Sequence, residues 1–285
     1  MHNIIREADA GAAFSYALAP TNSLTRDCAL ALHGSEDCLM RLFKIAALAA
    51  LTAFSTTLAW ASPEEIIRSK LQQAVPGTVI KSIKPAALPG FYEVNIPGAT
   101  VYASANGEYV LQGELLQIKG KQVINLTEQA QASARVGLIR GIDKRQAVVF
   151  PANGKPKAVL TVFTDTHCGY CRKLHQEVPA MNQMGIEVRY LAYPRDLPRV
   201  GANAGTGAEL ANIWCASNPE QAMTMAKQGQ SIPAGRKGCK APIAQQFALG
   251  QQMGVTGTPA IFDDKGRQLG GYITAQQAAQ RLGLN

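Results

Sequence analysis

The sequence has few charged residues for its length. Charged residues occupy 17% of the 285 positions, whereas hydrophobic residues reach 47%. This composition is not that of a disordered chain, and it supplies enough apolar residues for a buried core. The length favours two domains over one.

Acidic residues are also scarce, because 20 aspartates and glutamates stand against 28 lysines and arginines, for a net charge of +8. A run of basic residues is absent as well: they occur singly or in pairs such as Lys144-Arg145 and Arg236-Lys237. A protein that binds nucleic acid usually carries a clustered basic patch. We therefore expect no nucleic acid partner, but a positively charged surface that attracts acidic unfolded chains.

One segment, Met40–Ala61, has the layout of a secretory signal peptide. It begins with Arg41 and Lys44, continues through an apolar stretch, and ends in Ala59-Trp60-Ala61, a small-x-small cleavage site. The apolar stretch is short for a membrane anchor and is diluted by serine and threonine. We expect export with cleavage before Ser62.

A signal peptide normally stands at the start of a protein, but residues 1–39 precede this one. These residues show no periodic apolar face. We expect Met40 to be the initiator and residues 1–39 to be an upstream over-extension of the reading frame. Cys28 and Cys38 then leave the cysteine count. An even number of cysteines remains in an oxidising compartment and allows two disulfides: Cys168, Cys171, Cys215 and Cys239.

Residues 62–126 have the pattern of a small α+β domain, with one helix on an antiparallel sheet. The helix is expected to begin after Ser62, which is followed by proline and two carboxylates. A sheet this small can hardly bury its faces and edges alone, so we expect a dimerisation role. Residues 127–144 are predicted to form a linker helix, interrupted by Gly137 and Gly141. Turn signals separate the expected strands: 78–83, 91–96, 100–104, 109–118 and 122–125.

A different architecture is predicted for residues 145–285. A continuous apolar run from Lys157 is suited to a strand buried on both faces. A helix and a second buried strand from Ile186 complete a βαβ unit. A largely helical stretch over about 202–253 then precedes two strands around the turn at 264–266, and a final helix. The pattern indicates an α/β domain with a helical insertion.

Cys168 and Cys171 stand three apart at the junction where the first strand of the βαβ unit passes into its helix. A cysteine attacks as its thiolate, and an unperturbed pKa of about 8.5 leaves only a small fraction ionised near neutrality. If the helix starts at the motif, its free N–H groups and its dipole favour negative charge on Cys168. Cys171 lies one turn deeper on the same face. We therefore predict that Cys168 attacks and that Cys171 resolves.

Neighbouring residues are candidates for tuning this dithiol. Gly169 would let a substrate approach closely, and Tyr170 would adjust the local field. His167, when protonated, could lower the pKa of the attacking thiol. The alternative for His167 is an exposed loop residue, and the sequence leaves both possibilities open. We expect His175 to be structural and Asp165 to be a loop or capping group.

A metal half-site and a purely structural disulfide are the rival interpretations of the motif. Four-coordinate zinc needs two more ligands, and neither the histidines nor the pair Cys215 and Cys239 repeats a close ligand spacing. A structural disulfide between residues three apart closes too small a loop to restrict the unfolded chain much. We expect no metal and no cofactor.

Cys215 and Cys239 lie in the helical insertion without Cys-x-x-Cys spacing. A second catalytic pair is therefore not expected there. A bond between them would close a loop that contributes roughly 3 to 4 kcal/mol in the chain-entropy description. We assign these two residues to a structural disulfide.

Residues 157–285 resemble a thioredoxin-fold domain in the order of their elements. The stretches TVFTDTHCGYCRKLH, VRYLAYPR and GVTGTPAIF resemble the DsbC/DsbG family of periplasmic disulfide isomerases. The resemblance extends more weakly over the whole mature chain, and implies an N-terminal dimerisation domain, a linker helix and a catalytic domain. One departure is Val162, because thioredoxins carry a buried acid at that position. It argues against a buried carboxylate that deprotonates Cys171.

The resemblance implies a cis-proline pair, Thr258-Pro259, that faces the dithiol and pairs its backbone with an extended substrate. It implies a homodimeric thiol-disulfide isomerase, with chaperone activity, for misfolded or wrongly disulfide-bonded exported proteins. A membrane reductase of the DsbD type would return the protein to the dithiol. The alternatives are a DsbA-type dithiol oxidase, which would lack the dimerisation domain, and a redox-inert periplasmic chaperone.

Overall fold

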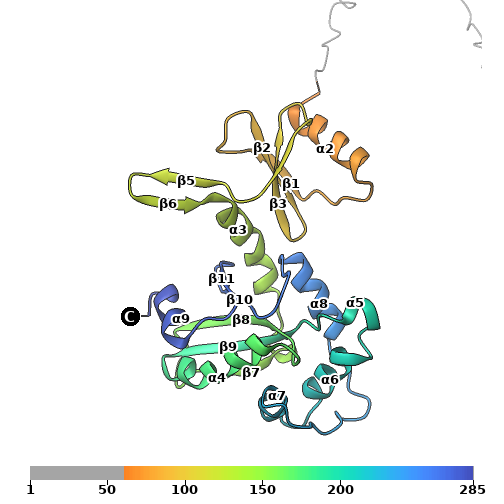
Figure 1. Cartoon of the computed structure of the whole chain (residues 1–285), viewed down its shortest axis with the longest axis vertical. Helices are drawn as coiled ribbons and strands as arrows, with labels where there is room; N and C mark the ends of the chain where they lie inside the picture. Colours follow the sequence, from red (N-terminus) through yellow and green to blue (C-terminus); the bar gives the residue numbers. More distant parts are fainter. Residues whose placement is uncertain (1–60, 285) are drawn as a thin grey trace, which may run out of the picture. The chain divides into compact units, whose positions relative to one another are not determined.

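The structure is a computed structural model that describes residues 61–284. The expected upstream extension with its two cysteines, and the signal peptide apart from Ala61, lie outside these residues. The described chain begins with α2, Pro63–Ala74 (Figure 1). The Ser62 hydroxyl accepts a hydrogen bond from the Glu65 N–H at 3.2 Å, and the Glu65 carboxylate accepts one from the Ser62 N–H at 2.8 Å. This capping box explains why α2 begins where the sequence predicts.

A four-stranded antiparallel sheet follows α2, in the order β1-β2-β3-β4. A small core lies between α2 and this sheet, centred on Ile67, Ile83, Val94 and Ala103. With so little apolar burial, this domain has limited stability of its own. The strands are β1 Ser82–Pro85, β2 Phe91–Ile96, β3 Ala99–Ser104 and β4 Val110–Gln112.

The prediction of one strand over 109–118 is wrong. After β4 the segment continues as β5, Leu116–Lys119, which pairs with β6, Gln122–Asn125, in a separate two-stranded sheet. The chain leaves the first sheet because the N–H of Leu115 donates to the Thr127 hydroxyl at 2.7 Å. A tertiary contact to the next helix therefore redirects the strand.

The strand predicted over 78–83 begins later than expected. Thr78 instead closes the turn after α2, because its N–H and its hydroxyl donate to the Val75 carbonyl at 3.2 and 2.7 Å. Pairing with β2 starts at Ser82, opposite Asn95. The strands predicted over 91–96 and 100–104 are confirmed as β2 and β3.

The linker helix is α3, Leu126–Arg140. It begins at Asn125, whose side chain accepts a hydrogen bond from the Glu128 N–H at 2.9 Å. The helix ends at the cap Gly141, earlier than predicted, and Gly137 lies inside it without interrupting it. A glycine costs a helix only about 1 kcal/mol, so the packing of α3 can hold the helix together through this position.

The second domain is built on a five-stranded sheet with the order β11-β10-β8-β9-β7. β8 and β9 are parallel, and the other neighbours are antiparallel. Both parallel strands are buried along most of their length, as their continuous apolar runs predict. The short edge strand β7 was not predicted. The strands are β7 Val148–Phe150, β8 Ala158–Thr164, β9 Ile186–Ala192, β10 Ala260–Asp263 and β11 Gln268–Gly270.

Helix α4, Gly169–Gln183, joins β8 to β9 and completes the predicted βαβ unit (Figure 1). The helical insertion consists of three main helices and a loop over 228–242. The expected fold class is confirmed in both parts, an α+β domain and an α/β domain with a helical insertion. The remaining helices are α5 Leu197–Val200, α6 Gly205–Trp214, α7 Pro219–Lys227, α8 Ile243–Gln252 and α9 Ala275–Leu282. Within residues 61–284, no helix has the length and apolarity that crossing a membrane requires.

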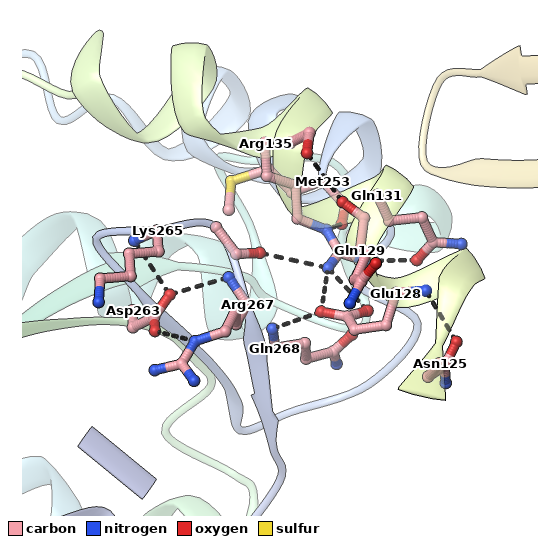
Figure 2. A network of polar contacts seen from close by, with 12 residues as sticks. Asn125, Glu128, Gln129, Gln131, Arg135, Met253, Asp263, Lys265, Arg267 and Gln268 are labelled. Carbon is pink, nitrogen blue, oxygen red and sulfur yellow. Dashed lines mark hydrogen bonds and ion pairs between the residues drawn. The ribbon is translucent and has the colours of Figure 1, made fainter. Parts of the chain in front are cut away.

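Arg135 anchors the linker helix α3 on the second domain (Figure 2). This side chain is 3% exposed, and it donates to the Met253 carbonyl at 2.9 Å and to the two Glu128 carboxylate oxygens at 2.9 and 3.1 Å. Glu128 also accepts a hydrogen bond from the Gln268 N–H at 2.7 Å. The guanidinium carbon lies 5.2 Å from the centre of the Phe262 ring. One buried side chain therefore ties α3 to the end of α8 and to the β10–β11 hairpin.

Candidate active site

Cys168 and Cys171 lie where β8 passes into α4. Cys168 is the N-cap of α4, and its sulfur accepts a hydrogen bond from the Cys171 N–H at 3.3 Å. Both thiols are free, with Cys168 4% exposed and Cys171 0% exposed. The helix thus begins at the motif, as the sequence predicts, and the Cys168 sulfur lies at the positive end of its dipole.

Thr258 faces the dithiol from the loop before β10. The Cys168 thiol donates a hydrogen bond to the Thr258 carbonyl at 3.2 Å, and the peptide bond between Thr258 and Pro259 is cis. The Thr258 hydroxyl is buried and has no hydrogen-bond partner in the part of the chain that the structure describes. The fold therefore brings the Thr-Pro pair, distant in sequence, into contact with the Cys168 thiol.

The surroundings shift the pKa values of the two thiols in opposite directions. Burial raises the pKa of the Cys168 thiol, but the Thr258 side chain and then the thiol and backbone N–H of Cys171 outweigh it and hold that pKa below its ordinary value. For Cys171 burial dominates and raises the pKa above its ordinary value, although the charge of Lys227 opposes this. Cys168 is therefore the thiol that ionises first.

The loop before Cys168 is ordered by Asp165, which is 2% exposed. Its carboxylate accepts hydrogen bonds from the His167 N–H at 2.7 Å and from the backbone and Nε of Arg195 at 3.0 and 3.1 Å. These contacts agree with the expected loop role of Asp165. They also hold the Arg195 charge near Cys168. This charge lowers the pKa of the Cys168 thiol as well, by less than the hydrogen bonds do. Arg195 was not predicted as a site residue.

His167 is exposed, and its Nε2 lies 2.8 Å from the Glu209 carboxylate. Glu209 also accepts a hydrogen bond from the Thr166 hydroxyl at 2.9 Å. Within residues 61–284 no hydrogen bond joins the His167 side chain to either active-site thiol. The ring therefore supports the loop through Glu209.

His175 is buried on α4 and does not bond to a thiol. Its two ring nitrogens lie 3.1 Å from the Tyr190 hydroxyl and 3.1 Å from the Thr224 hydroxyl. Burial, followed by the positive charge of Lys227, lowers the pKa of His175 to about 4. The ring is therefore neutral near physiological pH, and its contacts agree with the structural role expected from the sequence.

Lys227, at the end of α7, lies against the carboxyl end of β8. It was not predicted from the sequence as a site residue. It is 5% exposed, and its Nζ donates to the Thr164 hydroxyl at 2.6 Å and to the Asp165 carbonyl at 2.9 Å. Burial, opposed by the charges of Cys171 and Asp165, lowers the pKa of Lys227 to about 8. The available signal was a lysine four positions after the buried Met223, on the apolar face of its helix.

Gly169 and Tyr170, between the cysteines, are both exposed. A Cβ added at Gly169 would meet no atom within 4 Å, so the space outside this position is open. The Tyr170 side chain is 65% exposed, and its ring centre lies 6.4 Å from that of Tyr272. These two rings place an apolar surface beside the dithiol.

The structure joins Cys215 and Cys239 in a disulfide. The bond connects the C-terminal cap of α6 with the loop over 228–242, and the Arg236 N–H donates to the Cys215 carbonyl at 2.9 Å. The cross-link therefore restrains a loop that lacks regular structure. In residues 61–284, no group of three or more His, Cys, Asp or Glu side chains is arranged to hold a metal ion.

Comparisons with known proteins cover both domains. The family described as "Thioredoxin-like domain" matches residues 144–284, and "Disulfide bond isomerase protein N-terminal domain" matches residues 57–128. The thiol:disulfide interchange protein DsbC of Escherichia coli strain K12 is 34% identical, over 74% of this chain and 86% of its own length. DsbC of Salmonella typhimurium strain LT2 is 34% identical over 78% of this chain and 87% of its own. DsbC of Dickeya dadantii strain 3937 is 35% identical over 67% of this chain and 75% of its own.

Proposed function

The chain belongs to the DsbC family of thiol:disulfide interchange proteins, and on this premise we propose that it isomerises wrong disulfides in exported proteins through Cys168 and Cys171. Its enzymatic activity is thiol-disulfide exchange. The observation that carries the assignment of roles is the position of the Cys168 sulfur, which caps the N-terminus of α4 and accepts a hydrogen bond from the Cys171 N–H. A nucleophile with a separate resolving thiol needs this selective stabilisation of one thiolate.

In the proposed cycle, the Cys168 thiolate attacks one sulfur of a wrong substrate disulfide. That disulfide breaks, its other sulfur leaves as a thiolate, and a mixed disulfide with Cys168 forms. A different substrate thiolate then attacks the substrate sulfur of the mixed disulfide and releases the Cys168 thiolate. The substrate disulfide has moved, and neither the protein nor the substrate has been oxidised or reduced overall.

Cys171 provides an escape when rearrangement stalls. Its thiolate attacks the Cys168 sulfur, and the substrate sulfur leaves as a thiolate. This step reduces the substrate and leaves the Cys168–Cys171 pair oxidised. We propose that a membrane reductase of the DsbD type returns the dithiol, and that the exchange takes place in the periplasm, where disulfides persist.

Thr258 is proposed to hold the substrate at the dithiol together with Pro259. The Thr258 carbonyl already lies 3.2 Å from the Cys168 sulfur, so an extended segment paired with this backbone would have its disulfide within reach. Reshuffling of a substrate protein with scrambled disulfides tests the proposal. The reduced protein is expected to restore the native pairs catalytically, whereas oxidation of a reduced substrate without reshuffling would indicate a dithiol oxidase.

We propose that the N-terminal domain forms a homodimer through the edge strand β4. Tyr109, Val110 and Leu111 are 66%, 47% and 48% exposed on or next to this strand. An unpaired edge with exposed apolar residues favours pairing with another chain. The β5–β6 hairpin adds exposed apolar residues at Leu116, Ile118 and Val123, which supports binding of partly unfolded chains.

Leu111→Lys is expected to convert the dimer into a monomer in gel filtration, because a charge on an edge strand opposes chain pairing. The monomer should lose most reshuffling activity while Cys168 still reacts with a small disulfide. Gln276→Lys adds the same charge at an exposed position of α9, and should remain dimeric and active. A wild-type protein that elutes as a monomer would contradict the proposed dimer and favour the oxidase.

A further inference from the structure

Thiol-disulfide exchange creates a negative charge on a buried sulfur of this protein. When an incoming thiolate opens the Cys168–Cys171 disulfide at Cys168, the electron pair goes to Cys171, whose side chain is 0% exposed. The same thiolate must form before Cys171 can attack a mixed disulfide. A buried charge costs several kcal/mol unless it is paired. The protein therefore needs a counter-charge at Cys171.

A buried cation without an ionic partner lies in the same place. The Lys227 Nζ donates to the Thr164 hydroxyl at 2.6 Å and to the Asp165 carbonyl at 2.9 Å, and both of these acceptors are neutral. Among residues 61–284, no carboxylate lies within ion-pair distance of Lys227. The Asp165 carboxylate is bonded to Arg195 instead. A buried ammonium with only neutral partners is unusual, because burial penalises an unpaired charge.

The backbone of Asp165 connects this cation with the resolving thiol. The Asp165 carbonyl accepts the hydrogen bond from Lys227. The Lys227 charge and the Asp165 backbone both lower the pKa of Cys171, against the larger effect of burial. The Lys227 Nζ also lies 5.8 Å from the centre of the Tyr190 ring. Lys227 and the Cys171 sulfur therefore occupy one buried region at the carboxyl end of β8.

We propose that Lys227 is a positioning residue for the resolving cysteine, because its ammonium is the counter-ion of the Cys171 thiolate. This inference rests on the proposed function, since that thiolate arises only in dithiol exchange. When Cys171 leaves, the Cys168–Cys171 bond breaks, a bond from the attacking sulfur to Cys168 forms, and the negative charge moves to Cys171. When Cys171 resolves, its proton goes to solvent, its sulfur bonds to Cys168, and the substrate sulfur leaves as a thiolate.

The other groups around this cation do not replace it. His175 has a pKa of about 4 and is neutral where exchange proceeds, and burial raises the pKa of Tyr190, which stays protonated. Arg172 carries a positive charge, but its Nε is bonded to the Thr166 carbonyl at 3.0 Å and its side chain is exposed. The titratable and charged groups that face the region are Cys168, Cys171, Arg172 and His175 of α4, Asp165 before it, Tyr190 of β9 and Arg195 after β9.

Lys227→Met removes the charge and keeps an unbranched side chain of similar length. We expect the attack of Cys171 on a mixed disulfide to slow by about 10-fold or more near neutral pH. The reason is that a nearby positive charge stabilises a buried thiolate by at least this factor. The pH profile of this step should move to higher pH, since the Cys171 pKa rises without the cation. Lys227 is charged below its pKa of about 8, so the difference from wild type should be largest there and shrink as the pH rises above it.

The measurement is a quenched single-turnover reaction between the reduced protein and a small peptide disulfide, followed over a range of pH. The mixed disulfide at Cys168 is trapped by acid and quantified as it forms and decays. Its formation should stay close to wild type in Lys227→Met, and its decay should slow. Lys240→Met removes a charge from an exposed loop residue and should change neither rate.

Lys227→Arg keeps the charge and should retain most of the wild-type pH profile. A folded Lys227→Met variant that decays at the wild-type rate across the pH range would overturn the proposal, as would an arginine variant that is as slow as the methionine variant. If Lys227→Met does not fold, Lys227→Gln takes its place in the same comparison. Failure of the wild type to reshuffle scrambled disulfides would refute the proposed isomerase. The single-turnover comparison would still test whether Lys227 stabilises the Cys171 thiolate, because it measures only the attack of Cys171 on the mixed disulfide.

Discussion

Cys168→Ala is expected to abolish the reshuffling of scrambled disulfides, with a loss on the order of 10³-fold or more, as for the removal of other catalytic nucleophiles. The reason is that no other thiol among the described residues can take its place. Cys171 is 0% exposed and burial raises its pKa, while Cys215 and Cys239 are joined to each other. The measurement is the recovery of activity by a substrate protein refolded from a scrambled state.

Cys171→Ala is the matched control, because it removes the neighbouring thiol and leaves Cys168, the proposed nucleophile. This variant should still attack substrates, and it should accumulate mixed disulfides that resist release. Full reshuffling by Cys168→Ala would contradict the assignment of the nucleophile. Lost reshuffling with retained suppression of substrate aggregation would separate the enzymatic role from the proposed chaperone role.

Arg135→Ala is expected to lower the free energy of unfolding by about 2 to 3 kcal/mol. Breaking a buried ion pair usually costs about 3 to 5 kcal/mol, but the Glu128 partner is 30% exposed and can be partly rehydrated. The change also leaves the Met253 carbonyl without the guanidinium (Figure 2). Urea unfolding of the purified chain measures the effect.

Arg140→Ala is the control for this prediction, because Arg140 lies at the exposed end of the same helix. It should change the free energy of unfolding by less than about 0.5 kcal/mol, as for an exposed surface substitution. Equal effects of the two variants would show that the buried network does not anchor α3. Met253 and Phe262 flank the segment that carries Thr258, so the Arg135 variant should also reshuffle disulfides more slowly.

The dithiol could be predicted from the sequence because its chemistry is local. Cys168 and Cys171 are set by a strand that passes into a helix, and the helix begins at Cys168 itself. The contact with Thr258 depends on residues far apart in the chain, and it was inferred only through the family resemblance. The helix after Ser62 and the buried strands β8 and β9 were also predictable, because each follows from a capping pattern or a continuous apolar run.

Features created by tertiary packing could not be predicted in the same way. Lys227 and Arg195 reach the site from α7 and from the loop after β9. Arg195 ends the stretch VRYLAYPR, which carries part of the family resemblance, but that stretch does not reveal the contact with Asp165, and the α7 segment carries no recognisable motif. The break within 109–118 depends on the hydroxyl of Thr127, which no pattern of strand residues reveals. Arg135 looks like an ordinary surface residue of a polar helix until the second domain packs against it. In each case the decisive partner is distant in the sequence.

We propose that the Cys168–Cys171 pair works as a dithiol that reshuffles disulfides, rather than as a disulfide that oxidises other proteins. Thiol trapping of the exported protein in cells, with a reagent that adds mass to each free cysteine, distinguishes these two roles. Cys168 and Cys171 are expected to be mostly reduced, while Cys215 and Cys239 remain joined. A Cys168–Cys171 pair found mostly oxidised would refute the isomerase and favour a dithiol oxidase.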